Sequence, residues 1–440
     1  MAEIGACFAK DFRWLYPFSF MREKLFRLLQ APWFIALFAL FLRVAWLIYK
    51  ISAIPAEVLA TAPFENEVGN VAAALASGHG FCCLFRQPTG PTAWLSPVYP
   101  LLIAVIFKVF GTFTFRSFCA SVFLNSLFSA LTCFPLFFAA VRVAEKFTAS
   151  LATWLWALSP IAIILPYAWI WDSALSAFLA AMILWATLCL ADRPDLRGFA
   201  LYGLLWGISL LTNPALGALL PFLLVWILLR WRASIPQRLR YALVCAAAII
   251  LACLPWTLRN YVTFHRLVPL RSNFAYEFWS GNNEIFDPES REVNRITRYE
   301  QTRRYDHLGE TAFLNEKWQA AKHFVDARPS LYANLCARRF VATWLGTDSP
   351  VHDFFHADSA MARFLLLWNA VCLVFLVVGL ARLYNEQRTF FVPLAVFPFI
   401  FPVTFYLAHT SLRHRHPCDP ILLLLVAIAI TGCGRQMRPE

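Results

Sequence analysis

Charged residues are scarce in this sequence of 440 residues: Asp, Glu, Lys and Arg account for 15% of it, whereas a typical soluble domain carries roughly a quarter. Hydrophobic residues account for 60%, and the mean hydropathy is +0.59. A soluble domain cannot bury so much apolar surface, so the composition excludes a soluble enzyme, a disordered chain and a secreted disulfide scaffold. The apolar runs are continuous rather than alternating, which excludes a transmembrane β-barrel. The remaining class is a polytopic helical membrane protein.

The sequence also lacks the spacing of a metal site and the basic face of a nucleic-acid-binding domain. Most of the twelve cysteines stand in apolar segments, where Cys acts as a small hydrophobe. The adjacent Cys82 and Cys83 have no partners at metal-ligand spacing. The net charge is +12, but Lys and Arg of membrane proteins collect on cytoplasmic loops. We therefore expect no nucleic-acid partner, name no cofactor and no metal ligand, and leave a divalent metal open.

Apolar stretches that approach the length of a membrane span recur along the chain. A spanning helix needs about 20 apolar residues. The candidate crossings are 34–53, 117–141, 148–170, 173–191, 199–213, 215–229, 241–258, 364–381, 390–408 and 420–433. The predicted fold class is an all-α polytopic membrane protein, a bundle of about ten transmembrane helices with a helical and irregular outer segment.

Lys and Arg in short connections predict the orientation of the helices. We place the basic connections inside, which puts the N-terminus in the cytoplasm, and we expect any active site to face the periplasmic side of the inner membrane. The resulting regions are a cytoplasmic N-terminus 1–33, an N-terminal transmembrane module 34–258 with a periplasmic loop 54–97, a periplasmic segment 259–360, and C-terminal transmembrane helices with a short cytoplasmic tail, 361–440.

Two outer regions need a closer prediction. Between the loop 54–97 and the inner residue Arg142 the number of crossings must be odd, yet two apolar runs lie there. The shorter run, 98–110, has thirteen residues, so we expect a half-helix or an interfacial helix on the outer side. In the segment 259–360 we expect helices over Glu310–Val325 and Leu331–Leu345, preceded by an irregular stretch, 272–306.

Three carboxylates stand at the predicted outer face. Glu65 and Glu67 belong to the first outer loop, where Glu67–Leu75 predicts a short helix ended by Gly78. A carboxylate in the first turn of a helix is favourable, so Glu67 can be a dipole partner or a functional acid. Asp172 lies between two apolar runs without a basic neighbour, and it can be an N-cap or a site residue.

Five arginines are unusual for their position. Arg43 lies near the middle of the first crossing, where an unpaired charge is costly, so it must face the protein interior, face a wet cavity or reach the interface. Arg259, Arg271, Arg413 and Arg415 lie near the outer side of the bilayer, against the positive-inside trend. Guanidinium groups match phosphate oxygens; contact with anionic lipid headgroups is the alternative.

Three stretches together resemble a known family over about residues 34–430: Glu67–Phe81, Pro91–Gly111 and the Arg-His-Arg-His-Pro run from Arg413. The order of an acidic outer loop, a Pro-Val-Tyr-Pro-Leu helix and a long hydrophobic bundle resembles the GT-C membrane glycosyltransferases. Within them it is similar to the family 39-like group, which includes relatives of the protein O-mannosyltransferases and of the lipid A aminoarabinose transferases.

The resemblance implies an inverting hexosyl or pentosyl transfer in the cell envelope, from a polyprenyl-phosphate sugar to a lipid, glycan or protein acceptor. It implies a catalytic base in the first outer loop, which falls on Glu67 with Glu65 as runner-up, and a second acidic position at Asp172. Many relatives have Asp or an Asp-Glu pair where this chain has Glu-Asn-Glu. The remaining candidates are, for the donor phosphate, Arg259, Arg271, Arg413, Arg415 and Arg43, and, for the acceptor pocket, Trp94, Tyr99, His79 and Asn282.

The alternative function is a transporter or flippase for lipids or lipid-linked sugars. That class predicts ionisable residues paired inside several crossings. Apart from Arg43 and Lys50 in 34–53 and Lys108 in 98–110, the apolar segments contain no Asp, Glu, Lys, Arg or His, so the sequence favours the enzyme.

Overall fold

The computed structural model describes residues 24–434 except 25, 86–87, 169, 232, 285–294 and 357–358, and only the backbone of 295–299. The predicted cytoplasmic ends 1–23 and 435–440, with their basic residues, lie outside the described residues. Over the described ranges the chain is helical, and its extended pairing is limited to one bridge between Cys82 and Pro91. The predicted all-α fold class is confirmed.

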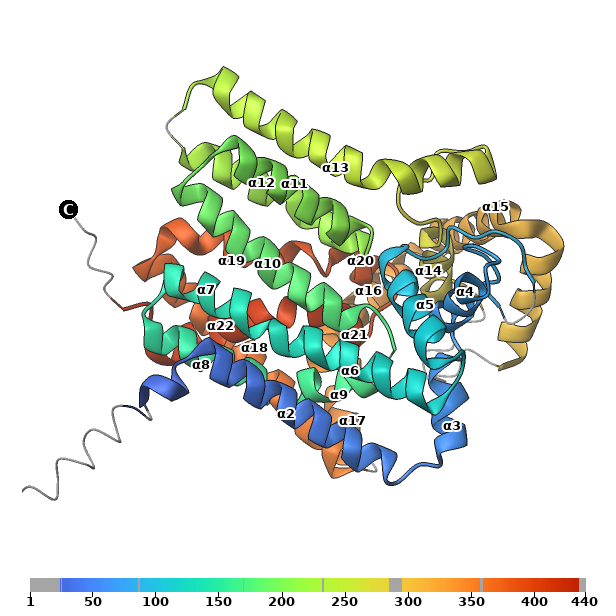
Figure 1. Cartoon of the computed structure of the whole chain (residues 1–440), viewed down its shortest axis with the longest axis horizontal. Helices are drawn as coiled ribbons and strands as arrows, with labels where there is room; N and C mark the ends of the chain where they lie inside the picture. Colours follow the sequence, from blue (N-terminus) through green and yellow to red (C-terminus); the bar gives the residue numbers. More distant parts are fainter. Residues whose placement is uncertain are drawn as a thin grey trace, which may run out of the picture.

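Apolar helices run side by side through one bundle (Figure 1). Among the described residues, six helices have the length and hydropathy of a membrane span, or seven if α8 and α9, which meet at a bend of 40°, form one. The number that crosses the membrane stays a prediction. The bundle helices are α2 (Pro32–Ile51), α6 (Phe115–Leu131), α7 (Cys133–Val143), α8 (Lys146–Leu158), α9 (Pro160–Ala168), α10 (Ser173–Asp192), α11 (Leu196–Leu210), η3 (Pro214–Leu219), α12 (Leu220–Arg230), α13 (Ile235–Phe264), α18 (Ala360–Glu386), η4 (Arg388–Phe390), α19 (Phe391–Ile400), α20 (Val403–Leu407) and α22 (Asp419–Thr431).

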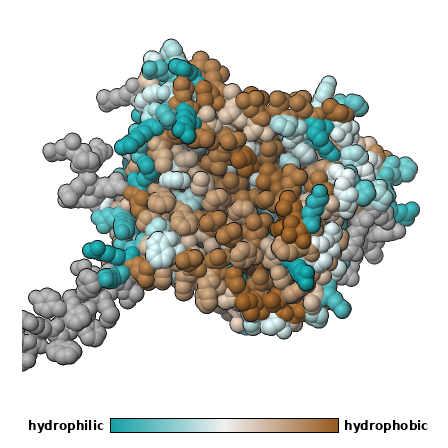
Figure 2. All heavy atoms as spheres, viewed as in Figure 1, coloured by the Kyte–Doolittle hydropathy of each residue, from teal (hydrophilic) through white to brown (hydrophobic). Residues whose placement is uncertain are grey.

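The surface of the bundle is apolar across its middle and hydrophilic at its two ends (Figure 2). Large apolar side chains of α13 stand exposed there, among them Ile250 and Leu251. An apolar belt of this kind is unfavourable in water and suits the hydrocarbon core of a bilayer. The chain is a multi-pass membrane protein.

The ends of several bundle helices meet at the left of Figure 1. Arg142 at the end of α7 pairs with Asp192 at the end of α10. The Glu145 amide donates to the Cys433 carbonyl over 3.1 Å, and the Cys433 amide donates to the Glu386 carboxylate over 2.6 Å. The connections after α7, α10, α18 and α22 therefore lie at one end. That this end faces the cytoplasm stays a prediction.

A second group of helices forms a lobe at the opposite end of the bundle (Figure 1), which we call the outer lobe because the sequence predicts it on the outer side. They are α3 (Ala56–Thr61), η2 (Ala62–Phe64), α4 (Glu67–Ala76), α5 (Val98–Phe110), α14 (Phe274–Gly281) and α15 (Arg295–Ala327). The chain then passes through α16 (Pro329–Leu345), α17 (Pro350–His356), α21 (Leu412–Arg415) and η5 (His416–Cys418). The helix α5 has 13 residues, too few for a span of about 20; its outer location stays a prediction.

One detail of the sequence prediction is wrong. The described parts of the stretch 272–306, which are 272–284 and 295–306, are not irregular, because they contain α14 and the first part of α15. The charged residues of this stretch obscure the helical pattern of α14 in the sequence, although its Trp279 side chain is buried. The helix α13 extends beyond the predicted crossing 241–258 at both ends, from Ile235 to Phe264, since a helix can continue out of the membrane; the crossing itself stays a prediction.

Small residues let α11 and α13 approach each other closely. A Cβ atom on Gly203 would lie 2.4 Å from the Cys245 carbonyl oxygen, and one on Gly207 would lie 2.4 Å from the Ala252 Cβ atom. Glycines four residues apart on one helix face are typical of close helix pairs in membranes. They hold α13 against the bundle although most of its surface is exposed.

Candidate functional site

A cavity of about 980 Å³ lies between the outer lobe and the outer ends of the bundle helices. Its size is within the range of small-molecule sites. It brings together segments that are far apart in sequence: the first outer loop, the α9–α10 connection, α14, α16 and residues 409–413. Its polar and aromatic lining includes Glu65, Glu67, Asn70, Trp94, Trp171, Asn273, Tyr276, Glu277, Arg338, Arg339, Asp348, His409 and Arg413.

The first outer loop delivers two carboxylates to this cavity. Asn66 caps α4, because its side-chain oxygen accepts a hydrogen bond from the Gly69 amide over 2.9 Å. A Cβ atom on Gly69 would lie 2.2 Å from the Phe64 carbonyl oxygen, so glycine is required for this tight turn. Glu65 and Glu67 flank Asn66, and both line the cavity. The choice between them as a base stays a prediction.

Asp172 lies in the α9–α10 connection, next to the cavity-lining residue Trp171. Its carboxylate accepts a hydrogen bond from Ser176 over 3.0 Å. Burial raises the pKa of Asp172, while the Ser176 hydrogen bond and the positive charges of Arg271 and Arg413 oppose that rise. Asp172 therefore shares its surroundings with two of the predicted phosphate-binding arginines.

Arg413 is the predicted arginine that lines the cavity, and its guanidinium carbon lies 4.8 Å from the centre of the Trp171 ring. Arg259 has another place: it donates to the carbonyl oxygens of Thr92 and Phe81, each over 2.7 Å. It thereby joins α13 to the first outer loop. The expected cluster of four outer arginines around one pocket is therefore formed only in part.

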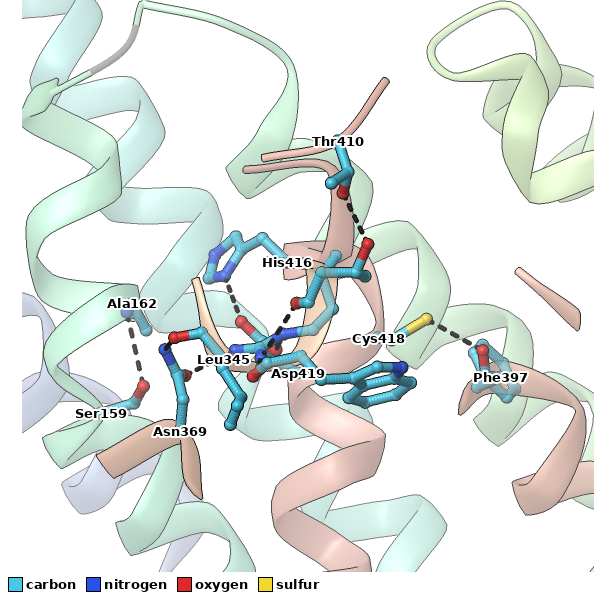
Figure 3. A network of polar contacts seen from close by, with 12 residues as sticks. Ser159, Ala162, Leu345, Asn369, Phe397, Thr410, His416, Cys418 and Asp419 are labelled. Carbon is cyan, nitrogen blue, oxygen red and sulfur yellow. Dashed lines mark hydrogen bonds and ion pairs between the residues drawn. The ribbon is translucent and has the colours of Figure 1, made fainter. Parts of the chain in front are cut away.

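Arg415 belongs to a buried network behind the cavity. It donates to Asp419 and to Asn369, each over 2.9 Å, and to the Trp344 carbonyl oxygen over 2.7 Å. His416 points toward Asp419 (Figure 3), at 2.9 Å between ring nitrogen and carboxylate oxygen. A buried guanidinium requires such acceptors, so this network accounts for Arg415 without a bound phosphate.

Arg43 is buried between α2, α6 and α8. It donates to the Ser129 hydroxyl over 2.8 Å and to the carbonyl oxygens of Ala39 and Ala157 over 2.8 and 3.1 Å. Its side chain therefore faces the protein interior, one of the three positions considered from the sequence. Arg43 does not line the cavity, so its assignment to the donor phosphate is corrected: it satisfies backbone acceptors inside the bundle.

Of the four predicted pocket residues, Trp94 lines the cavity, with its ring centre 4.9 Å from that of Tyr276. The other three do not. Tyr99 is buried and donates to Asn125 over 2.9 Å. His79 is exposed on the surface, and Asn282 is buried where it donates to the Leu407 carbonyl oxygen over 3.0 Å. Apolar packing around α5 buries Tyr99, which sequence alone assigns equally well to an interface or to a pocket.

Other polar residues of the cavity were missed from the sequence. A Glu277 carboxylate oxygen lies 3.3 Å from His409 Nδ1, and Arg338 pairs with Asp348 over 2.6 Å. Glu277, Arg338 and Asp348 belong to the segment 259–360, which has thirteen basic and thirteen acidic residues, and no motif distinguishes them from solvated surface residues. Among the described residues, no three His, Cys, Asp or Glu side chains lie close enough to hold a metal ion together.

A buried carboxylate fixes the cavity wall around Trp94. Glu310 accepts hydrogen bonds from the hydroxyl of Ser272 over 2.6 Å, of Tyr305 over 2.8 Å, and from the Ala93 amide over 3.0 Å. The Thr92 hydroxyl also donates to it. Burial, followed by the charge of Glu310 and its hydrogen bond, raises the pKa of Tyr305, which keeps the phenol protonated as a donor. Glu310 thus ties α15 to the first outer loop.

The helical bundle, its apolar belt and the cavity at one end define the class as a polytopic membrane protein with an outer-lobe site. Comparison with protein-family models gives no match, and comparison with curated proteins gives no relative. Solved structures do match. The apo crystal structure of the Archaeoglobus fulgidus oligosaccharyltransferase is 13% identical with a TM-score of 0.51, over 91% of this chain and 50% of that one.

Two further structures were compared. The archaeal oligosaccharyltransferase AglB from Archaeoglobus fulgidus, in complex with an inhibitory peptide and a dolichol-phosphate, is 13% identical with a TM-score of 0.48, over 84% of this chain and 46% of that one. Apo ArnT from Cupriavidus metallidurans is 14% identical with a TM-score of 0.36, over 88% and 78%. The chain spans about half the length of the oligosaccharyltransferase it matches. At these identities the likeness concerns the fold, which is GT-C-like, as the sequence resemblance predicted.

Proposed function

We propose that the chain is a membrane glycosyltransferase that moves a sugar from a polyprenyl-phosphate donor to a periplasmic acceptor with inversion. The observation that carries this proposal is the cavity at the outer lobe. Glu65, Glu67 and Arg413 all line this one cavity, in a GT-C-like fold.

The reaction needs a base for the acceptor and a positive group for the leaving phosphate. Glu67 takes the proton from an acceptor hydroxyl as that oxygen attacks the anomeric carbon. The bond from the anomeric carbon to the phosphate oxygen breaks, and polyprenyl phosphate leaves with the electron pair. Glu67 is partly buried while Glu65 is exposed, and the more enclosed carboxylate is the better candidate for the base because the cavity can hold it in one orientation.

The leaving phosphate requires a positive charge at or near the cavity wall. Arg413 lies on the cavity wall. The charges of both Arg413 and Arg271 act on the Asp172 carboxylate. We assign the donor phosphate to these two arginines. Arg43, Arg259 and Arg415 are assigned to the protein interior and to loop anchoring, because their guanidinium groups donate to protein acceptors.

A donor on a polyprenyl chain accounts for the position of the cavity. The outer ends of the bundle helices border it, so a lipid phosphate at the membrane surface reaches it without leaving the bilayer. The same geometry would serve a flippase for lipid-linked sugars, which is the second candidate function. The two differ in outcome, because an enzyme cleaves the bond between sugar and phosphate and a flippase leaves it intact.

Mass spectrometry of the envelope tests this proposal. In a deletion strain we expect one polyprenyl-linked sugar to accumulate and one envelope glycan, lipid or protein to lose that sugar. Complementation with Glu67→Gln should leave the strain in the deletion state. The control is Glu57→Gln, since Glu57 is an exposed carboxylate in α3 of the same outer loop. Accumulation of the carrier-linked sugar confined to the cytoplasmic leaflet would favour the flippase.

A further inference from the structure

Two adjacent cysteines lie in the first outer loop, apart from the proposed chemistry. The sulfur atoms of Cys82 and Cys83 are 2.7 Å apart, and both side chains are partly exposed. The other described cysteines lie in helices or next to helix ends, and most of them are buried. Cys82 and Cys83 are therefore the thiol pair that a reagent on the outer side can reach.

The backbone around these cysteines is held in a defined shape. Cys82 pairs with Pro91 in a β-bridge, and the Cys83 amide donates to the Gly90 carbonyl oxygen over 3.1 Å. Cys83 has φ of 64°, a left-handed conformation that a residue other than glycine seldom adopts. A strained residue thus lies next to this bridge, where the two thiol groups meet.

We propose that Cys82 and Cys83 are a redox modification site, which closes to a vicinal disulfide on contact with the oxidising outer compartment and reopens on reduction. The oxidant is a disulfide-form thiol oxidoreductase. One cysteine thiolate attacks its disulfide and forms a mixed disulfide. The second cysteine then displaces the oxidoreductase thiol, so that two thiols of this chain become one S–S bond and the donor disulfide becomes two thiols.

The order of attack follows from the surroundings of Cys82. Burial, the hydrogen bond shared with Cys83 and the charge on Cys83 raise the pKa of Cys82 to about 12, against the opposing charge of Arg259. Cys83 is therefore the first nucleophile. Once its sulfur is in a mixed disulfide, it carries no thiolate charge, and the barrier to ionising Cys82 falls.

The disulfide is expected to be reversible rather than a permanent staple. Cα atoms across a trans peptide are about 3.8 Å apart, below the usual range of about 4.4–6.8 Å for disulfide-bonded residues. Strained and exposed disulfides have the more oxidising potentials and are easily reduced. A bond between neighbouring residues also restrains the unfolded chain very little, so its formation changes local geometry rather than overall stability.

The modification would act on the wall of the cavity. Leu84 and Phe85, which follow the cysteine pair directly, line the cavity. The Leu84 carbonyl oxygen accepts a hydrogen bond from Asn70 over 3.0 Å, and Asn70 is on α4 near the two carboxylates. Closing the ring rotates the backbone at Cys83, so the position of this wall becomes dependent on the redox state.

Thiol mapping of the full-length protein tests the proposal. The protein is purified in detergent from cells lysed with N-ethylmaleimide. The mass of a chymotryptic peptide that contains both cysteines is then measured by mass spectrometry before and after reduction. We expect a fraction that lacks both thiol hydrogens and takes up two maleimides only after reduction. In buffers of reduced and oxidised glutathione, the same peptide should change between the two forms. Cys119→Ser should leave this signal unchanged, and Cys82→Ser should abolish it.

Two results would overturn the proposal. If both thiols remain open to alkylation across the whole range of glutathione buffers, or each only takes up glutathione, the pair does not close. If the ring forms in these buffers but is absent from cells grown without reductant, the loop does not meet the oxidising compartment. Both readouts are thiol masses, so they are independent of whether the chain transfers a sugar.

Discussion

Glu310→Gln is the substitution whose effect on the site can be worked from the structure. The carboxylate accepts hydrogen bonds from three hydroxyl groups, those of Thr92, Ser272 and Tyr305, and from the Ala93 amide. Glutamine has the same shape but keeps only one acceptor oxygen, and its NH₂ group meets donors. The Ala93 amide cannot reverse its role, so the substitution loosens the loop that carries Trp94.

The size of the effect follows from the hydrogen bonds that are lost. A buried hydrogen bond to a charged group contributes about 1.5–3 kcal/mol, and these contributions are not additive. We expect the free energy of local opening of the loop to fall by about 3 kcal/mol, which corresponds to amide exchange on the order of a hundredfold faster. Hydrogen–deuterium exchange of the peptide spanning Thr92–Leu95, in detergent-solubilised protein, measures this directly.

The matched control is Glu316→Gln on the same helix. Glu316 pairs with the exposed Arg304 over 2.7 Å, and exposed ion pairs contribute little. Amide exchange of the loop in the Glu316→Gln protein should therefore equal that of the wild type. Equal exchange in the Glu310→Gln and Glu316→Gln proteins would refute the role of Glu310 as the anchor of the cavity wall.

Three further substitutions test other parts of the account. Arg43→Met should lower the thermal midpoint of the purified protein by several degrees, because the Ser129 hydroxyl and the carbonyl acceptors lose the hydrogen bonds from Arg43. Binding of the polyprenyl-phosphate sugar should be unchanged; if a stable Arg43→Met protein no longer binds it, Arg43 contacts the phosphate. Gly207→Val should cost about 1–3 kcal/mol, because its Cβ atom meets that of Ala252, and an unchanged midpoint would contradict the close α11–α13 contact. Burial and neighbouring positive groups lower the pKa of His414 well below its usual 6.5, so the unfolded chain binds the extra proton and stability falls as the pH drops below about 6.5. His414→Gln should flatten this dependence between pH 7 and 5, and an unaltered slope would contradict it.

The membrane part of the fold could be predicted because its signals are local. Continuous apolar runs give the helix positions, and the connections after α7 and α10, both predicted on one side, meet at one end, as the Arg142–Asp192 pair shows. The helix of Glu67 and its end near Gly78 also agree with α4. These features depend on residues close in sequence.

The lining of the cavity could be predicted only in part because it depends on tertiary packing. Glu65, Glu67, Trp94 and Arg413 were found from the sequence, and all four line the cavity. The outer arginines look alike in sequence, and only the fold shows which of them donate to carbonyl groups. Polar residues such as Glu310 carry no local sign of burial, because the groups that satisfy them come from distant segments.

The most direct test of the proposed function is the fate of the bond between sugar and phosphate. Purified protein in proteoliposomes is incubated with the polyprenyl-linked sugar extracted from the deletion strain and with an envelope extract as acceptor, and polyprenyl phosphate is measured by mass spectrometry. We expect that the wild type and Glu57→Gln release polyprenyl phosphate as the acceptor gains the sugar, and that Glu67→Gln is slower by on the order of a hundredfold or more. A donor that stays intact with the wild type, or a Glu67→Gln protein as fast as Glu57→Gln, would contradict it.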